Sequence, residues 1–117
     1  FRSLEVLGDG TQSKPYMHVD DLVKIILDIE HFQNQKISKF NIGPTDLLTV
    51  TDIVKIVLNI TKLEPKIIFG SNDRGWEGDV PRYQFAESLP EFCKNRTILN
   101  SYESVYKAFL EIWKNGF

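Results

Sequence analysis

The strongest constraint in the sequence is a pair of stretches whose apolar residues recur at helical spacing around more than half of the helix. In residues 21–32 one apolar face comprises Leu22, Ile25, Ile26, Ile29 and Phe32, and Val23 and Leu27 widen it. A second such stretch begins near Thr49 or Thr51, and its apolar residues are Ile53, Val54, Ile56, Val57, Leu58 and Ile60. A helix on the surface of a small domain usually has a polar outer face. We therefore expect another domain or a partner to cover these helices.

The rest of the pattern alternates short strands with helices. Strands are predicted at residues 4–7, 40–42, 66–70 and 83–85, from short apolar runs bounded by turn residues. A last helix is predicted over 100–114, with Asn100 and Glu103 as a cap pair, and a short helix after Pro90. Asp20 or Asp21 is the expected cap of the helix at 21–32. The prediction is one mixed α+β domain over residues 1–117, with three main helices and short strands.

Composition excludes several classes of protein. The 117 residues carry 14 Lys and Arg against 16 Asp and Glu, a net charge of −2, whereas nucleic-acid binders are usually basic. No apolar run approaches the roughly 20 residues of a membrane span. A single cysteine, Cys93, excludes an internal disulfide and favours a reducing, cytoplasmic location. We expect no nucleic-acid partner and no membrane association.

Familiar catalytic patterns are weak or missing. Gly8 and Gly10 lack the third glycine and the immediate helix of a dinucleotide-binding loop, so a turn is the better interpretation. Cys93 has no local signature of a thiol nucleophile. His18 beside Asp20 and Asp21 fits helix capping better than a metal site, which needs further ligands at defined spacing. We predict no catalytic, cofactor-binding or metal-binding residue in this chain.

Two polar loops, residues 8–16 and 72–81, carry the more informative groups. Lys14 and Arg74 suit phosphate oxygens, while Gln12 and Asp79 suit hydroxyl or base groups. From the residues alone, an anion site and two merely solvated loops both remain open.

In these loops the sequence resembles the NAD-dependent epimerase/dehydratase family, the extended short-chain dehydrogenases. The resemblance runs in register through five segments: Gly8-Asp9-Gly10-Thr11-Gln12 with His18-Val19-Asp20-Asp21, Phe40-Asn41-Ile42-Gly43, Val50-Thr51-Asp52-Ile53, Arg74-Gly75-Trp76-Glu77-Gly78-Asp79-Val80-Pro81, and Ser101-Tyr102-Glu103-Ser104-Val105. It implies the C-terminal, substrate-binding portion of a sugar-nucleotide epimerase or dehydratase, without the Rossmann core. The chain opens at Phe1 and its only methionine is Met17, which agrees with a missing N-terminal part.

The resemblance also implies partners and roles. The parent would use NAD or NADP, held with the catalytic Tyr-x-x-x-Lys pair by the missing N-terminal Rossmann domain, so this fragment would bind no cofactor and be inactive alone. It would bind a nucleoside diphosphate sugar through Gln12, Lys14, Arg74 and Asp79. Lys14 stands where the family commonly has an arginine near the diphosphate, and lysine lacks the bidentate fork of arginine. A homodimer is expected.

The sequence also departs from the family pattern. Pro15 replaces a usual acidic residue, and the family's motifs between residues 86 and 98 have degenerated, including Glu87-Ser88. These departures keep open an alternative of another class, a degenerate non-catalytic module of the same fold that serves protein association.

Overall fold

The computed structural model describes residues 2–32, 34–86 and 89–116, and the Glu87-Ser88 departure lies outside them. Over these residues the chain forms β1 (Ser3–Val6), β2 (Ser13–Lys14), α1 (Val19–Phe32), β3 (Leu48–Thr49), α2 (Val50–Thr61), β4 (Lys66–Phe69), the 3-10 turn η1 (Glu91–Cys93) and α3 (Ser101–Asn115). This is the mixed α+β class that the sequence predicts, with helices and short strands at most of the expected places.

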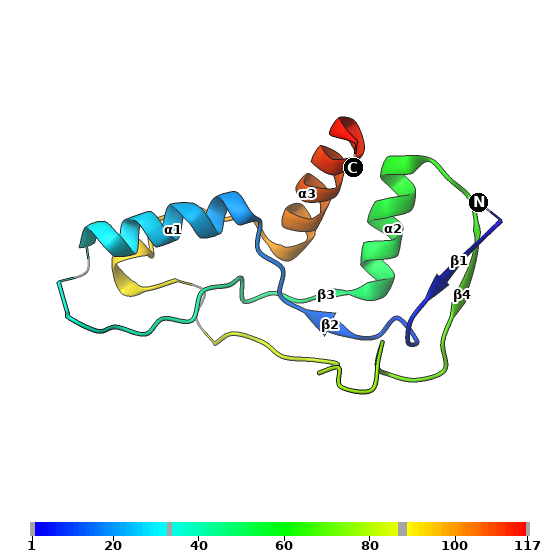
Figure 1. Ribbon diagram of the computed structural model, residues 1–117, viewed down its shortest axis with the longest axis horizontal. Coiled ribbons are helices and arrows are strands. Elements are labelled where there is room, and N and C mark those ends of the chain that lie inside the picture. The colour runs from blue at the N-terminus through cyan, green and yellow to red at the C-terminus, as the bar shows by residue number, and fades with distance from the viewer. Residues whose placement is uncertain (1, 33, 87–88, 117) are drawn as a thin grey trace.

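The elements lie along an elongated body of 55 × 32 × 21 Å. Figure 1 shows α1 at one end, α2 and α3 near the middle, and β1 with β4 at the other end. β1 and β4 form a parallel pair in the register Ser3 to Lys66 and Val6 to Phe69, and β2 pairs antiparallel with β3. Helices α2 and α3 pack against each other. Among the described helices, none combines the length and the hydrophobicity needed to cross a bilayer.

Local capping signals explain where α2 and α3 begin. The Thr49 hydroxyl accepts the N–H of Asp52 at 3.1 Å, so Thr49 is the cap of α2. Asn100 and Glu103 form the expected capping box of α3: each side chain accepts the other residue's N–H, at 2.8 and 3.0 Å. Both caps confirm the sequence prediction.

The start of α1 differs from the prediction that Asp20 or Asp21 caps this helix. The helix begins at Val19, and the ring Nδ1 of His18 accepts the N–H of Asp20 at 3.2 Å. Asp20 and Asp21 therefore lie in the first turn instead of at the cap. Asp21 is buried and accepts the N–H of Leu99 at 2.9 Å, which joins α1 to the segment before α3.

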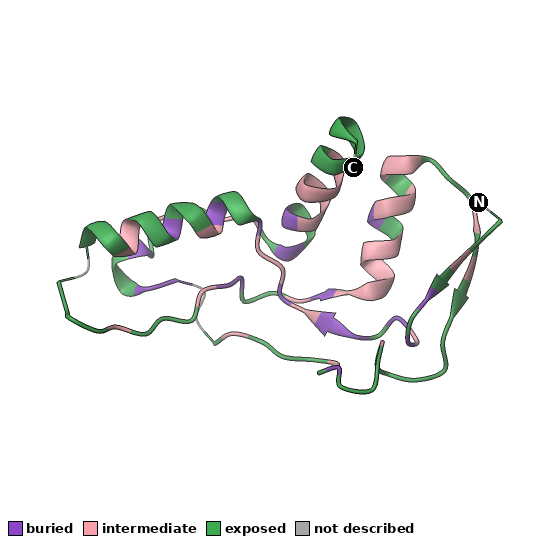
Figure 2. Ribbon diagram, in the orientation of Figure 1, coloured by how far each residue is buried: buried purple, intermediate pink, exposed green. Residues whose placement is uncertain are grey.

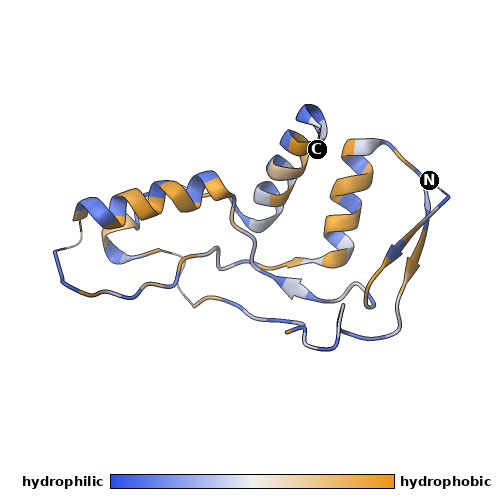
Figure 3. Ribbon diagram, in the orientation of Figure 1, coloured by the Kyte–Doolittle hydropathy of each residue, from blue (hydrophilic) through white to orange (hydrophobic). Residues whose placement is uncertain are grey.

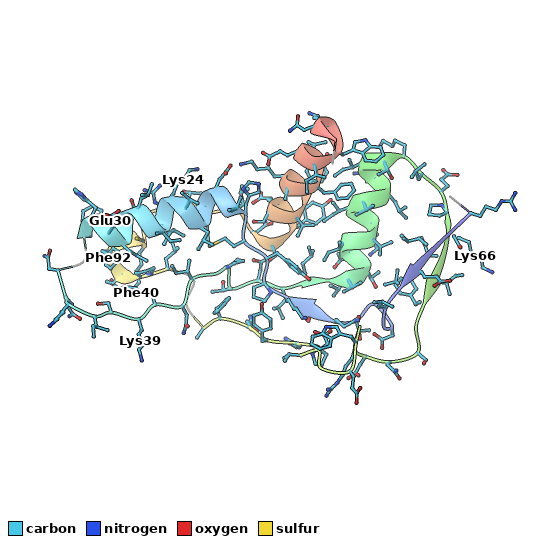
Figure 4. The ribbon with its side chains drawn as sticks, in the orientation of Figure 1. Lys24, Glu30, Lys39, Phe40, Lys66 and Phe92 are labelled. Carbon is cyan, nitrogen blue, oxygen red and sulfur yellow. The ribbon has the colours of Figure 1, made fainter. Side chains whose placement is uncertain are left out.

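The predicted strands at 40–42 and 83–85 are wrong. Neither range forms a strand, and the nearest pairing is an isolated bridge between Arg82 and Ser13. A strand requires a neighbouring backbone to accept its hydrogen bonds, and no strand of the described chain lies beside residues 40–42. Phe40 instead contacts Phe92 edge-on, with ring centroids 5.6 Å apart. Figure 4 shows both residues near the C-terminal end of α1.

One core cluster is small and lies under one side of α1, while Val6, Leu48 and Ile56 are buried in β1, β3 and α2. Ile25, Leu89 and Cys93 are buried together, with Met17, Ile29, Ile42 and Ile98 packed around them. Arg96 binds the Asp28 carboxylate through Nε at 2.5 Å and Nη2 at 2.7 Å, which fastens the segment after η1 to α1. One face of α1 is thus covered by other residues of this chain.

The opposite face of α1 is apolar and exposed. Val19, Val23, Ile26 and Leu27 form this outer stripe, and each is about half exposed or more. Figure 2 shows much of α1 as exposed, and Figure 3 shows long hydrophobic stretches on the same helix. For α1 the wide apolar circumference predicted from the sequence takes the form of two faces, of which this chain covers one. The apolar residues of α2 are instead buried or half-buried, and α3 packs against this helix.

A pair of neighbouring isoleucines on α1 tests this division. Ile25→Ala should lower the free energy of unfolding by about 2–4 kcal/mol because it opens a cavity at a fully buried site. The matched control Ile26→Ala, at a half-exposed position of the same helix, should cost less than about 1 kcal/mol. Urea denaturation of this chain measures both, and equal losses would contradict the described packing.

Candidate functional site

The two polar loops singled out in the sequence lie against each other. The N–H of Asp9 donates to the carbonyl of Asn72 at 2.6 Å, and the N–H of Gly70 donates to the carbonyl of Gly8 at 2.8 Å. Further along, the N–H of Ser13 donates to the carbonyl of Pro81 at 2.9 Å. Residues that are about 65 positions apart in sequence are therefore held together by backbone hydrogen bonds.

The first loop turns sharply at two glycines and is braced by Gln12. Gly8 and Gly10 have φ of +79° and +85°, in the left-handed region that favours glycine. The Gln12 side chain is buried, donates from Nε2 to the Leu7 carbonyl at 3.0 Å and accepts the Gly10 N–H on Oε1 at 3.1 Å. Both ends of this amide are engaged by the chain itself, so Gln12 shapes the turn.

The first turn of α2 holds the same loop from the other side. The N–H and the hydroxyl of Thr51 both donate to the Gly10 carbonyl, at 3.1 and 3.0 Å, and the N–H of Val50 donates to the Gln12 carbonyl at 3.0 Å. Two loop carbonyls thus satisfy N–H groups that a helix start leaves without intrahelical partners. Sequence reasoning missed the role of Thr51, although a hydroxyl in the first turn of a helix was visible.

Lys14 and Asp79 form an ion pair between the two loops. Lys14 Nζ lies 2.5 Å from Asp79 Oδ1, and Asp79 Oδ2 accepts the N–H of Gly75 at 3.3 Å. The Asp79 side chain is only 8% exposed, against 28% for Lys14. The Lys14 ammonium holds the pKa of Asp79 below its usual value although burial opposes this shift, and the hydrogen bond to Asp79 raises the pKa of Lys14.

Arg74 is the remaining cation of the predicted set. It lies exposed in the second loop, and its side chain forms no hydrogen bond or ion pair with any residue that the structure describes. Its neighbour Gly75 donates to Asp79, so the backbone beside Arg74 is fixed while the guanidinium is free. Trp76, next along, is 66% exposed.

The four residues predicted for the site therefore lie in one region, with unequal freedom. Gln12, Lys14 and Asp79 are engaged within the chain, and Arg74 is available to an external group. Tyr16, two residues after Lys14, is partly buried, and burial is the main cause that raises its pKa. An unpaired guanidinium on a braced loop is suited to bidentate contact with a phosphate.

These residues do not fit a dinucleotide cofactor. A Cβ at Gly8 would lie 2.1 Å from Gln12 Nε2, so the space over the turn is filled by this chain's own amide. The turn leads into β2 instead of a helix whose N-terminus could receive a pyrophosphate. The described residues therefore provide no cradle of that type.

The histidine and the cysteine considered in the sequence lie elsewhere. His18 Nε2 lies 3.2 Å from Glu111 Oε2, and His18, Asp20 and Glu111 could bring one ligand atom each to a metal ion. The Lys107 ammonium is already 2.8 Å from Asp20 Oδ2, which neutralises this carboxylate. Cys93 is buried in the core, and its pKa is raised by burial, which disfavours a reactive thiolate.

Comparison with known proteins supports the resemblance seen in the motifs. No family model matches the sequence, and no curated protein matches it. Among solved structures, a UDP-galactose 4-epimerase matches 99% of this chain with a TM-score of 0.75 and 26% identity. The protein MoeE5 in complex with UDP-glucose and NAD matches 97% with a TM-score of 0.71 and 22% identity.

A third match is UDP-glucuronic acid 4-epimerase from Bacillus cereus in complex with UDP-glucuronic acid and NAD, with a TM-score of 0.63 and 18% identity over 97% of this chain. The chain spans only 35–37% of the length of these three proteins. The fold, the order of the motifs and the partial coverage all indicate similarity to one part of these longer proteins. The chain is similar to the C-terminal part of the NAD-dependent epimerase/dehydratase family, the extended short-chain dehydrogenases.

Proposed function

We propose that this chain is the substrate-binding portion of an NAD-dependent sugar-nucleotide epimerase or dehydratase, and that Arg74 binds the diphosphate of a nucleoside diphosphate sugar. The observation that carries the proposal is the free guanidinium of Arg74 on a loop whose backbone is fixed. Gln12, Lys14 and Asp79 form the frame around it. Structures of this fold that contain UDP-glucose or UDP-glucuronic acid support this class of ligand.

The chain's contribution to the reaction is binding and orientation. The rest of the protein would hold the nicotinamide cofactor, which supplies hydride chemistry at the sugar carbon that bears the hydroxyl. Holding the sugar nucleotide by its diphosphate limits the motion of the sugar, and such positioning can supply several kcal/mol of the barrier reduction, up to about 7–11 in well-oriented systems. Because the described residues offer no dinucleotide cradle, this chain by itself should not catalyse the reaction.

The outer stripe of α1 is proposed as the contact with the NAD-binding part. Val19, Val23, Ile26 and Leu27 present a contiguous apolar surface that soluble proteins generally bury. The same stripe would serve a non-catalytic module that associates with another protein, which is the second candidate function. Sugar-nucleotide binding separates the two candidates. Homodimer formation and a cytoplasmic location remain predictions from the sequence.

Arg74→Ala tests the binding role directly. The substitution should weaken binding of a UDP- or GDP-sugar by about 1.5–3 kcal/mol through loss of a charge-assisted hydrogen bond, roughly a 10- to 150-fold rise in Kd. Calorimetric titration of the full-length protein with the sugar nucleotide measures this Kd. The control Arg2→Ala removes an exposed arginine before β1 and should leave Kd unchanged. An unchanged Kd in Arg74→Ala would remove Arg74 from the site.

Isolating the chain tests the partner proposal. On its own it should self-associate through the outer stripe of α1 and should show no epimerase turnover with NAD and a UDP-sugar. Val23→Glu with Leu27→Glu places charges on the stripe and should shift the sedimentation coefficient toward that of a monomer. Turnover by the isolated chain would contradict the binding-portion proposal, and a strictly monomeric wild-type chain would contradict the role of the stripe.

A further inference from the structure

We propose that Lys14 acts on the ligand through Asp79 and the loop that bears Arg74, as a positioning residue, and does not itself bind the phosphate. This inference rests on the proposed function, in which Arg74 is the phosphate ligand. It assigns the two cations of the site different tasks: Arg74 contacts the diphosphate, and Lys14 keeps Arg74 in place.

The first support is the burial of the partner carboxylate. Asp79 is 8% exposed and has Lys14 Nζ at 2.5 Å. If Lys14 turned toward an external phosphate, the Asp79 carboxylate would lose its charged partner and keep backbone hydrogen bonds, among them the one from Gly75 at 3.3 Å. A buried carboxylate without its counter-ion is strongly destabilising. Lys14 is therefore held by Asp79 before any ligand arrives.

The second support is the way in which Asp79 closes the loop. Its Oδ2 accepts the N–H of Gly75, and its own N–H donates to the carbonyl of Trp76 at 3.1 Å. These two bonds fold residues 75–79 back on themselves, directly after Arg74. Because Lys14 belongs to β2, which pairs with β3, the ion pair ties this folded loop to a fixed element.

The third support is that the charge state of the pair is stable near neutral pH. The pKa of Asp79 is lowered by Lys14, so its contribution is present above the ordinary Asp value of about 3.9 and is lost as the pH falls through the lower folded value. The pKa of Lys14 is raised by Asp79, so its contribution is present below about 10.4 and is lost as the pH rises through the higher folded value. Burial raises the pKa of the nearby Tyr16 as well, so this phenol stays neutral where the pair is charged.

A double-mutant cycle tests the proposal in the protein from the complete reading frame. Lys14→Met keeps the length of the side chain and removes its charge, and Lys66→Met, at the outward-pointing lysine of β4 in Figure 4, is the matched control. Kd for UDP-glucose is measured in Lys14→Met, in Arg74→Ala and in the double variant. Contacting or linked residues give non-additive effects, and independent ones give additive effects.

We expect Lys14→Met to raise Kd by about tenfold, within the range of couplings between linked residues. It should have no further effect in the Arg74→Ala background, and Lys14→Arg should restore binding because arginine can also pair with Asp79. The result that overturns the proposal is an additive loss in the double variant, since a direct phosphate contact would persist without Arg74.

A measurement without ligand separates this proposal from the proposed function. Amide hydrogen exchange at Gly75 and Asp79 should accelerate in Lys14→Met between pH 6 and pH 8 and stay unchanged in Lys66→Met. Unchanged exchange in Lys14→Met overturns the positioning role whatever the ligand. If the wild-type protein binds no sugar nucleotide while exchange still accelerates, the proposed function fails and the loop-positioning role of Lys14 is retained.

Discussion

The Gly10 carbonyl is the point on which the site depends. It accepts both the N–H and the hydroxyl of Thr51, so the first turn of α2 and the glycine turn hold each other. Gln12 braces the inside of the same turn, and its backbone carbonyl accepts the N–H of Val50. Because the second loop is bonded to the first by backbone hydrogen bonds, this one junction determines where Lys14, Asp79 and Arg74 lie. The site is built from a helix start and two turns, with the buried Val6 and Leu48 in the adjoining strands.

The apolar burial at α1 is incomplete. Ile25, Leu89 and Cys93 form a core on one side, while the outer stripe of α1 remains exposed. The bidentate Arg96–Asp28 pair compensates in part by fixing the segment after η1 with polar bonds. A helix with two apolar faces is expected where an element is shared between two bodies of a larger protein. The coverage of about 36% of the similar epimerase is consistent with this view.

Sequence reasoning succeeded where the signal is local. The caps at Thr49 and Asn100 act over three residues, and the helical periodicity of α1, α2 and α3 is contained in each helix. It failed where a partner distant in the chain decides the structure. His18 caps α1 while its other ring nitrogen meets Glu111, 93 positions away, and residues 40–42 have the composition of a strand without a strand beside them. β2 and β3 have two residues each, which is too short for an alternating pattern to be detected in the sequence.

The same limit applies to the site. The residue types alone placed Gln12, Lys14, Arg74 and Asp79 in two candidate loops, and the structure brings these loops together. That Lys14 and Asp79 pair with each other, leaving Arg74 free, depends on a contact across 65 residues that composition does not encode. The central claim is that this free guanidinium serves a sugar nucleotide. Calorimetric titration of the protein from the complete reading frame with UDP-galactose, UDP and uridine tests it most directly. The account predicts saturable binding of UDP-galactose and UDP and much weaker binding of uridine, and no saturable heat with any diphosphate would contradict it.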